Sequence, residues 1–94
     1  MSAGRYTDTG ELTFGGKSVG LTFNPSANSE VGQIKKTAAH FIDTICGPNS
    51  EKLTYAAEYP DVSVEGEVVA MRKLALRAAQ EAQMWAVKAA TWNS

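Results

Sequence analysis

The chain has 94 residues, with nine Lys and Arg against ten Asp and Glu, one cysteine and one histidine. The near-balanced charge argues against a protein that coats DNA or RNA or binds an anionic membrane. One cysteine and one histidine exclude an intramolecular disulfide and a conventional four-ligand zinc site, so we expect no metal. A single domain over 1–94 buries little more than about 60% of its unfolded surface, so association between copies is expected to add stability.

Residues 1–9 are polar and show no hydrophobic periodicity, which predicts a flexible arm. They contain no apolar export segment, and no run in the chain approaches the about 20 apolar residues that span a bilayer. Together with the lone thiol, this indicates a cytoplasmic protein.

Residues 10–24 alternate apolar and polar side chains on either side of Gly15 and Gly16. Consecutive glycines supply the positive φ angles that tight hairpin turns need, so the pattern predicts a β-hairpin. We therefore expect an α+β fold, in which this hairpin precedes a long antiparallel two-helix hairpin over 29–93 with a linker at 47–63.

The first helix is predicted over 30–46. Ser26, Asn28 and Ser29 are all competent N-caps, and Gly47 followed by Pro48 is a typical helix stop. Its apolar residues recur at helical spacing and form one stripe, made of Val31, Ile34, Ala38, Phe41, Ile42 and Ile45.

The second helix is predicted over 64–92, with Ser63 as its N-cap. Apolar residues spaced alternately four and three apart form a heptad pattern along it, made of Val64, Val68, Met71, Ala75, Ala78, Ala82, Trp85, Ala89 and Trp92. The alanines in the middle allow another helix to approach closely. Since exposed tryptophans are costly in water, a symmetric oligomer is expected to cover part of this pattern.

Charge is distributed unevenly despite the balanced total. Residues 43–67 carry six acidic side chains against Lys52, whereas residues 68–94 carry four basic side chains against Glu81. Two interpretations remain open: solvated faces that pair between neighbouring chains, or a basic pocket for an anionic ligand.

Catalysis has little support in the sequence. His40 lies off the apolar stripe, and Cys46 ends a helix, where the helix dipole disfavours a thiolate. No pair of carboxylates has acid–base spacing, so we expect no catalytic residue and no cofactor.

A ligand site has more support, because aromatic and polar residues gather around the predicted hairpin. Phe14, Lys17, Phe23 and Asn24 lie on or beside it. The Asn24–Ser29 segment precedes a helix N-terminus, where a phosphate binds favourably; the alternative is that the segment only caps the helix. Aromatic rings stack on bases and cations bind phosphate. Further cations are Lys35, Lys36, Arg72, Lys73 and Arg77.

Three segments, GELTFGGKSVGLTFNPS, SEVGQIKKTAAHFIDTI and EAQMWAVKAATW, resemble the first described phage anti-Thoeris protein family. The two helices also resemble the hairpin domain of the phage anti-CBASS cyclic-nucleotide sponge. The resemblance covers about residues 10–46 and 64–93, and its most specific pieces are TFNPS and MWA.

The resemblance implies a non-enzymatic sponge in the cytoplasm of the infected bacterium. Such proteins sequester immune nucleotide messengers, above all glycocyclic ADP-ribose (gcADPR), and some relatives hold cyclic di- and trinucleotides in separate pockets. Assemblies of the family are dimers or hexamers.

The resemblance also suggests site residues. Phe14 would stack on adenine, with Phe23 second; polar and phosphate contacts would come from Asn24, Ser26 and Arg72, assisted by Lys17 or Arg77. A second, cyclic-dinucleotide pocket would use Tyr6 and Lys36. Two alternatives without a nucleotide ligand stay open: a protein-interaction module and a structural phage protein.

Overall fold

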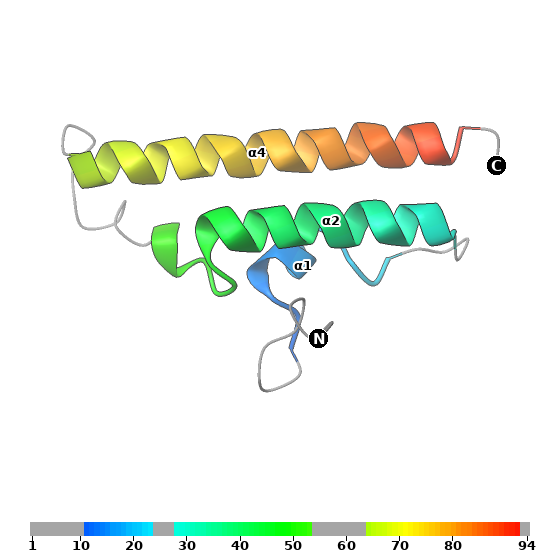
Figure 1. Ribbon diagram of the computed structural model, residues 1–94, viewed down its shortest axis with the longest axis horizontal. Helices are drawn as coiled ribbons and strands as arrows, with labels where there is room; N and C mark the ends of the chain where they lie inside the picture. Colours follow the sequence, from blue (N-terminus) through cyan, green and yellow to red (C-terminus); the bar gives the residue numbers. More distant parts are fainter. Residues whose placement is uncertain (1–10, 24–27, 54–63, 93–94) are drawn as a thin grey trace.

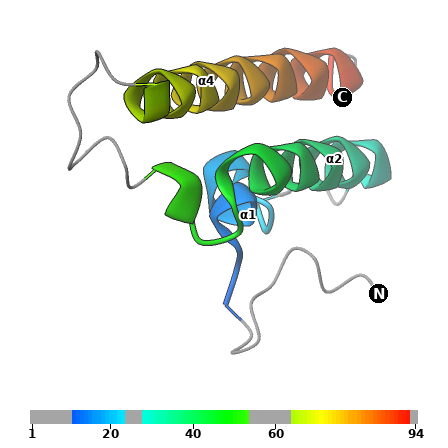
Figure 2. The same cartoon turned by 60° about the vertical axis from the view of Figure 1, so that its left-hand side comes forward.

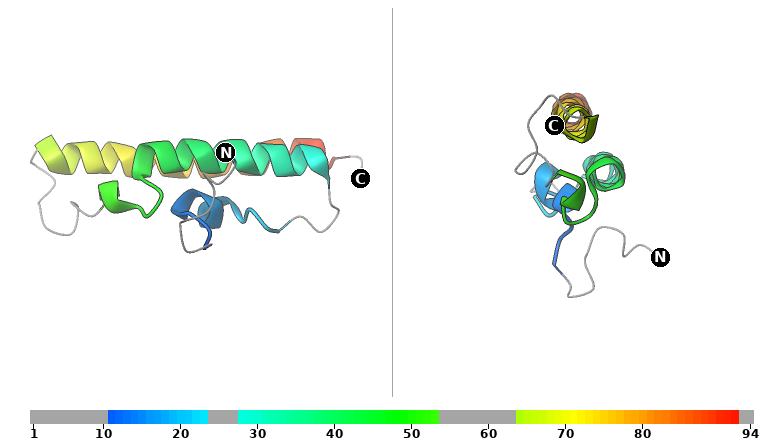
Figure 3. Two further views of the ribbon diagram at one scale, coloured as in Figure 1. Left: turned by 60° about the horizontal axis from the view of Figure 1, so that its bottom comes forward. Right: turned by 90° about the vertical axis from the view of Figure 1, so that its left-hand side faces the viewer.

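The computed structural model describes residues 11–23, 28–53 and 64–92. These residues form the helices α1 (Phe14–Val19), α2 (Ser29–Cys46) and α4 (Val64–Ala90), with a short 3₁₀ helix, η2 (Glu51–Leu53), after α2 (Figure 1). The helices α2 and α4 run antiparallel and side by side, and α1 packs against α2 (Figures 1 and 2). It also contacts α4. The view along the long helices in Figure 3 (right) shows α1, α2 and α4 at the corners of a triangle.

The predicted β-hairpin over 10–24 is wrong. The described part of this segment holds the helix α1 and no strand, so the fold is helical and not α+β. Thr13 caps the N-terminus of α1 by accepting a hydrogen bond from the Gly16 N–H, and Gly20 ends the helix in the left-handed conformation at φ 63°. Gly15 and Gly16, which were expected in a turn, belong to α1 and are buried from solvent.

The two long helices are confirmed, with small changes at their ends. Of the three expected N-caps of α2, Asn28 has the role: its side-chain oxygen accepts from the N–H groups of Glu30 and Val31. The helix stops at Gly47, whose N–H donates to the Asp43 carbonyl. The later helix begins at Val64, as predicted, and ends at Ala90 instead of residue 92.

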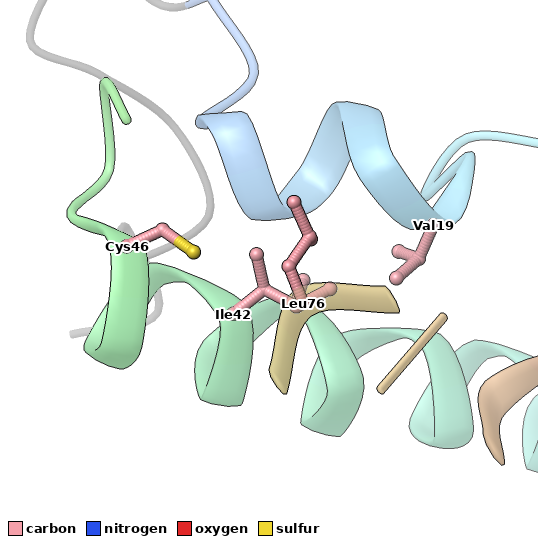
Figure 4. Packing of buried hydrophobic residues seen from close by; sticks show 5 residues of the cluster. Val19, Ile42, Cys46 and Leu76 are labelled. Atoms are coloured by element: carbon pink, nitrogen blue, oxygen red, sulfur yellow. The ribbon is translucent and has the colours of Figure 1, made fainter. Parts of the chain in front are cut away.

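The core lies where α1, α2 and α4 meet. Figure 4 shows Val19 from α1, Ile42 and Cys46 from α2, and Leu76 from α4 pointing toward one another. Ile42 and Cys46 are completely buried. Phe41, which the predicted stripe placed in the core, is half exposed because α2 turns Ala39 and Ile42 inward.

The face that α4 buries is not the heptad pattern found in the sequence. Its buried residues are Gly66, Val69, Leu76 and Gln83, whereas most of the pattern is exposed. The helix therefore carries a second apolar face, which no described residue of the chain covers.

Several predictions fall outside the described residues. These are the flexible arm at 1–9, Asn24 and Ser26, and residues 54–63 of the linker. The single domain over 1–94 and the symmetric assembly stay predictions.

Candidate functional site

A hydrogen-bonded junction fixes α1 on α2. The Thr13 hydroxyl donates to the Asp43 carboxylate over 2.6 Å, and the Gly15 N–H donates to the other Asp43 oxygen, also over 2.6 Å. Thr13 is fully buried and Asp43 nearly so. Hydrogen bonds to a charged carboxylate are stronger than those to a neutral acceptor, so both bonds stabilise the contact between α1 and α2.

Gly15 makes this close approach possible. A Cβ atom at this position would collide with the Ala39 carbonyl oxygen of α2 and lie 2.6 Å from the Asp43 carboxylate. Helix-interior glycine is unfavourable by about 1 kcal/mol relative to alanine, yet only glycine lets the two backbones meet here. The junction thereby holds the N-terminal turn of α1 against the last turns of α2.

A polar pocket of about 190 Å³ lies beside the N-terminus of α1. The half-buried Phe14 and the exposed Lys17 line it from α1, and the loop after α2 also lines it. The Phe14 N–H donates to the Pro48 carbonyl oxygen over 2.6 Å, which fixes the loop beside the ring. Its lining consists of Glu11, Leu12, Phe14, Lys17, Pro48, Asn49 and Ser50. We refer to it as the α1 pocket.

Two of the predicted site residues, Phe14 and Lys17, are thus brought together. The other lining residues were not predicted, and the loop at 48–50 lies more than 30 residues after Phe14 along the chain. Only the length of α1 and its contact with the end of α2 could have indicated them.

Phe23 lies at the other end of α1, and its ring is 70% exposed. The Lys35 ammonium donates to the Gly20 carbonyl oxygen over 3.0 Å and to the Phe23 carbonyl oxygen. It also lies 5.4 Å from the centre of the Phe23 ring. Lys35 is only 6% exposed, so it holds the 20–23 turn, whereas its neighbour Lys36 is exposed.

The predicted arginines lie elsewhere. Arg72 donates to the Ile45 carbonyl oxygen over 2.7 Å and borders a second pocket, of about 370 Å³, between η2 and the start of α4. Arg77 donates to the Gln80 side-chain oxygen over 2.8 Å, and Gln80 in turn donates to the Ser18 carbonyl oxygen of α1. Neither arginine lines the α1 pocket within one chain.

The remaining side chains considered for chemistry have other surroundings. Cys46 is buried, and desolvation raises the pKa of its thiol, with a further upward effect from Asp43 and opposing effects from Arg72 and Lys52. His40 is exposed on α2. Across residues 11–23, 28–53 and 64–92, no cluster of His, Cys, Asp and Glu side chains has the size to hold a metal ion. None of the helices described has both the length and the apolar composition needed to cross a membrane.

Comparison with known protein families identifies the family of the chain. The family model of the Acb2/Tad1 hairpin domain matches residues 16–91. The chain belongs to this family. The resemblance to the anti-Thoeris and anti-CBASS sponges is therefore confirmed at the level of the family. No curated protein and no solved structure matches the chain.

The part of the chain that matches the Acb2/Tad1 hairpin domain starts inside α1 and includes both long helices. Most predicted site residues lie within it: Lys17, Phe23, Asn24, Ser26, Lys36, Arg72 and Arg77. Tyr6 and Phe14 precede it.

Proposed function

We propose that this chain is a phage anti-defence sponge, which binds immune nucleotide messengers without cleaving them and so keeps them from the bacterial effector. The observation that carries this proposal is the match to the Acb2/Tad1 hairpin domain over most of the chain. Its place of action would be the cytoplasm of the infected host. The preferred messenger would be a cyclic ADP-ribose isomer such as gcADPR, with cyclic di- or trinucleotides in a second pocket near Tyr6 and Lys36.

The α1 pocket has the chemistry that such a ligand needs. The Phe14 ring offers an apolar face for adenine, and the Lys17 ammonium offers a positive charge for a phosphate. The Glu11 carboxylate and the Asn49 and Ser50 side chains can bond ribose hydroxyls or the adenine amino group. These groups favour binding and supply no evident acid–base pair for cleavage.

The volume of the α1 pocket indicates that other residues complete the site. Pockets for drug-sized ligands measure about 300–1,000 Å³, and the α1 pocket measures about 190 Å³. We propose that Asn24 and Ser26 supply further contacts, with Phe23 as a second stacking ring. Arg72 and Arg77, which lie outside this pocket in one chain, would come from another copy in a homo-oligomer, either a dimer or a hexamer.

Calorimetric titration with gcADPR tests the proposal. The double change Phe14→Ala and Asn24→Ala should abolish the heat of binding, while His40→Ala, which removes an exposed ring from α2, should leave it unchanged. Circular dichroism should show the same helicity in all three proteins. Unchanged affinity in the double variant would overturn these site residues.

An interaction module without a small ligand is the second candidate, because α4 and the turn that follows it expose an apolar face with two tryptophans. A thermal-shift screen separates the two functions. A ligand at a concentration of 100 times its Kd adds about 2.7 kcal/mol to the free energy of unfolding. The absence of a shift with gcADPR and with cyclic di- and trinucleotides would favour the interaction module or a structural phage protein.

A further inference from the structure

The α1 pocket holds a carboxylate and an ammonium group that do not neutralise each other. Glu11 and Lys17 are both exposed and line the same pocket, yet they form no ion pair. Neither side chain makes a hydrogen bond or an ion pair with another described residue. By contrast, Lys35 and Arg72 donate to backbone carbonyl groups of the chain. Opposite charges at the α1 pocket are therefore left for a ligand.

Glu11 lies close to a firmly held part of the pocket wall. Thr13, two residues later, donates to the Asp43 carboxylate over 2.6 Å, and the Phe14 N–H donates to the Pro48 carbonyl oxygen over 2.6 Å. These two bonds fix the backbone that follows Glu11 on the end of α2 and on the next loop. The pocket therefore presents a charged acceptor near a fixed ring.

The Glu11 carboxylate restricts which part of a nucleotide can lie beside it. An ionised carboxylate only accepts hydrogen bonds, its two oxygens suit two adjacent donors, and its charge repels phosphate. Adenine offers one amino group beside the N1 acceptor on its base-pairing edge. A ribose with two adjacent free hydroxyls offers two donors side by side. This diol matches Glu11 best, and a phosphate matches Lys17.

We propose that Glu11 is a specificity-determining residue of the α1 pocket, and that it accepts hydrogen bonds from two adjacent free hydroxyls of a ribose. The proposal rests on the proposed function and deepens it, because it names the feature that distinguishes the preferred messenger. A cyclic ADP-ribose isomer such as gcADPR keeps such a pair on its second ribose. In a 3′,3′-cyclic dinucleotide the phosphodiester bonds leave one free hydroxyl on each ribose.

The two classes of messenger should therefore respond differently to Glu11. Hydrogen bonds to the charged carboxylate offset its repulsion of the phosphates when a diol is present. A 3′,3′-cyclic dinucleotide meets the same repulsion with a single donor in return. The carboxylate thus favours gcADPR and opposes cyclic dinucleotides in the α1 pocket.

Calorimetric titration of Glu11→Gln with gcADPR and with 3′,3′-cyclic di-AMP tests this role. The variant keeps the size of the side chain and removes its charge. We expect the affinity for gcADPR to fall on the order of tenfold, because hydrogen bonds to a charged acceptor are the stronger ones. The affinity for 3′,3′-cyclic di-AMP should stay the same or rise. An unchanged affinity for gcADPR, or an equal change for both messengers, would overturn the proposal.

Two further variants separate this effect from general electrostatics. Glu81→Gln, at an exposed position of α4, removes the same charge far along the chain and should alter neither affinity. Lys17→Gln should weaken both messengers, because both carry phosphates. A Glu81→Gln protein that loses gcADPR affinity as Glu11→Gln does would assign the effect to net charge and contradict the proposal.

A modified ligand tests the diol directly. Periodate followed by borohydride cleaves the bond between the two hydroxyl-bearing carbons of gcADPR and leaves the base and both phosphates unchanged. With the wild-type protein, this ligand should bind on the order of tenfold more weakly than gcADPR; with Glu11→Gln, the two ligands should bind alike. Such a cycle isolates the pairing of one residue with one ligand group. An equal loss with both proteins would show that Glu11 does not bind the diol.

The same titrations distinguish this proposal from the proposed function. A wild-type protein that binds gcADPR with an affinity independent of Glu11 overturns the role of this residue and leaves the sponge supported. A wild-type protein that binds neither gcADPR nor 3′,3′-cyclic di-AMP overturns both.

Discussion

The Thr13 hydroxyl donates to the Asp43 carboxylate over 2.6 Å, and this bond joins the N-cap of α1 to the last turn of α2. The Thr13 oxygen also accepts from the Gly16 N–H, so one side chain both starts the short helix and anchors it. The α1 pocket depends on this junction, because Phe14 is the next residue in the chain.

Asp43→Asn should destabilise the protein. The substitution removes the charge that strengthens two buried hydrogen bonds and places an amide N–H₂ group where an acceptor is needed. We expect a loss of about 1.5–3 kcal/mol in the free energy of unfolding, measured by urea denaturation. Glu81→Gln, at an exposed position of α4, is the control and should change it by less than about 0.5 kcal/mol. An equal effect of the two changes would show that the junction contributes little.

Gly15→Ala should cost more than Gly20→Ala, although Gly20 has the positive φ angle. A methyl group on Gly15 collides with backbone of α2, whereas one on Gly20 meets nothing nearer than 3.9 Å. We expect the free energy of unfolding to fall by about 3 kcal/mol in Gly15→Ala, because the added methyl group overpacks the contact and strains the hydrogen bond to Asp43. In Gly20→Ala we expect a fall of about 1 kcal/mol, from the left-handed conformation. Denaturation curves of the two variants measure this order directly, and the reverse order would argue against the tight contact between α1 and α2.

Lys35→Met should reduce both the affinity for gcADPR and the free energy of unfolding. Lys36→Met should change neither the fold nor the α1 pocket. Lys35 holds the Gly20 and Phe23 carbonyls and lies under the Phe23 ring, so its loss releases the turn that carries this ring. A reduction of gcADPR affinity by roughly tenfold is expected, equal to about 1.4 kcal/mol. The check is calorimetry at a temperature where circular dichroism shows the variant folded. A folded Lys35→Met protein with wild-type affinity would remove Phe23 and its turn from the site.

The pKa of Cys46 predicts a fall in stability at alkaline pH. Burial raises the pKa of the thiol in the folded state, so the unfolded chain loses this proton first as the pH rises. Above about pH 8.5 the free energy of unfolding therefore decreases, by at most about 1.4 kcal/mol per pH unit, until the folded thiol also ionises. Cys46→Ala should flatten this part of the pH profile of the unfolding free energy. An equally steep profile in the variant would assign the alkaline loss to other groups.

The long helices could be predicted from local patterns, because their caps and periodicity act over a few residues. Asn28, Gly47 and the start at Val64 follow directly from capping preferences and from the spacing of apolar residues. The arrangement of these helices as a hairpin agrees with the resemblance to the hairpin domain of the anti-CBASS sponge.

The N-terminal segment could not be predicted in the same way. Two glycines and an alternating pattern favour a β-hairpin locally, and the helix α1 forms because Asp43, 28 residues away from Gly15, accepts its N–H. The flanking Thr13 and Gly20 were a helix signal of the right length, outweighed by the Gly–Gly pair. In this case a tertiary contact decides the secondary structure.

The candidate site was predicted only in part for the same reason. Phe14 and Lys17 are one helical turn apart, so both reach the same pocket. The arginines were grouped with them by charge and by the family resemblance, and hydrogen bonds to the Ile45 carbonyl and to the Gln80 side chain hold them elsewhere. Charge in a sequence indicates a class of ligand, but it does not place the side chains.

Recovery of the ligand after binding is the most direct test of the central claim. The protein is mixed with gcADPR, free ligand is separated by ultrafiltration and quantified by mass spectrometry, and the retained complex is then denatured by heat. The sponge predicts that free gcADPR falls in proportion to the protein added and that heating returns all of it unaltered. Free gcADPR that stays constant, or a cleaved product in the heated sample, would contradict the proposed function.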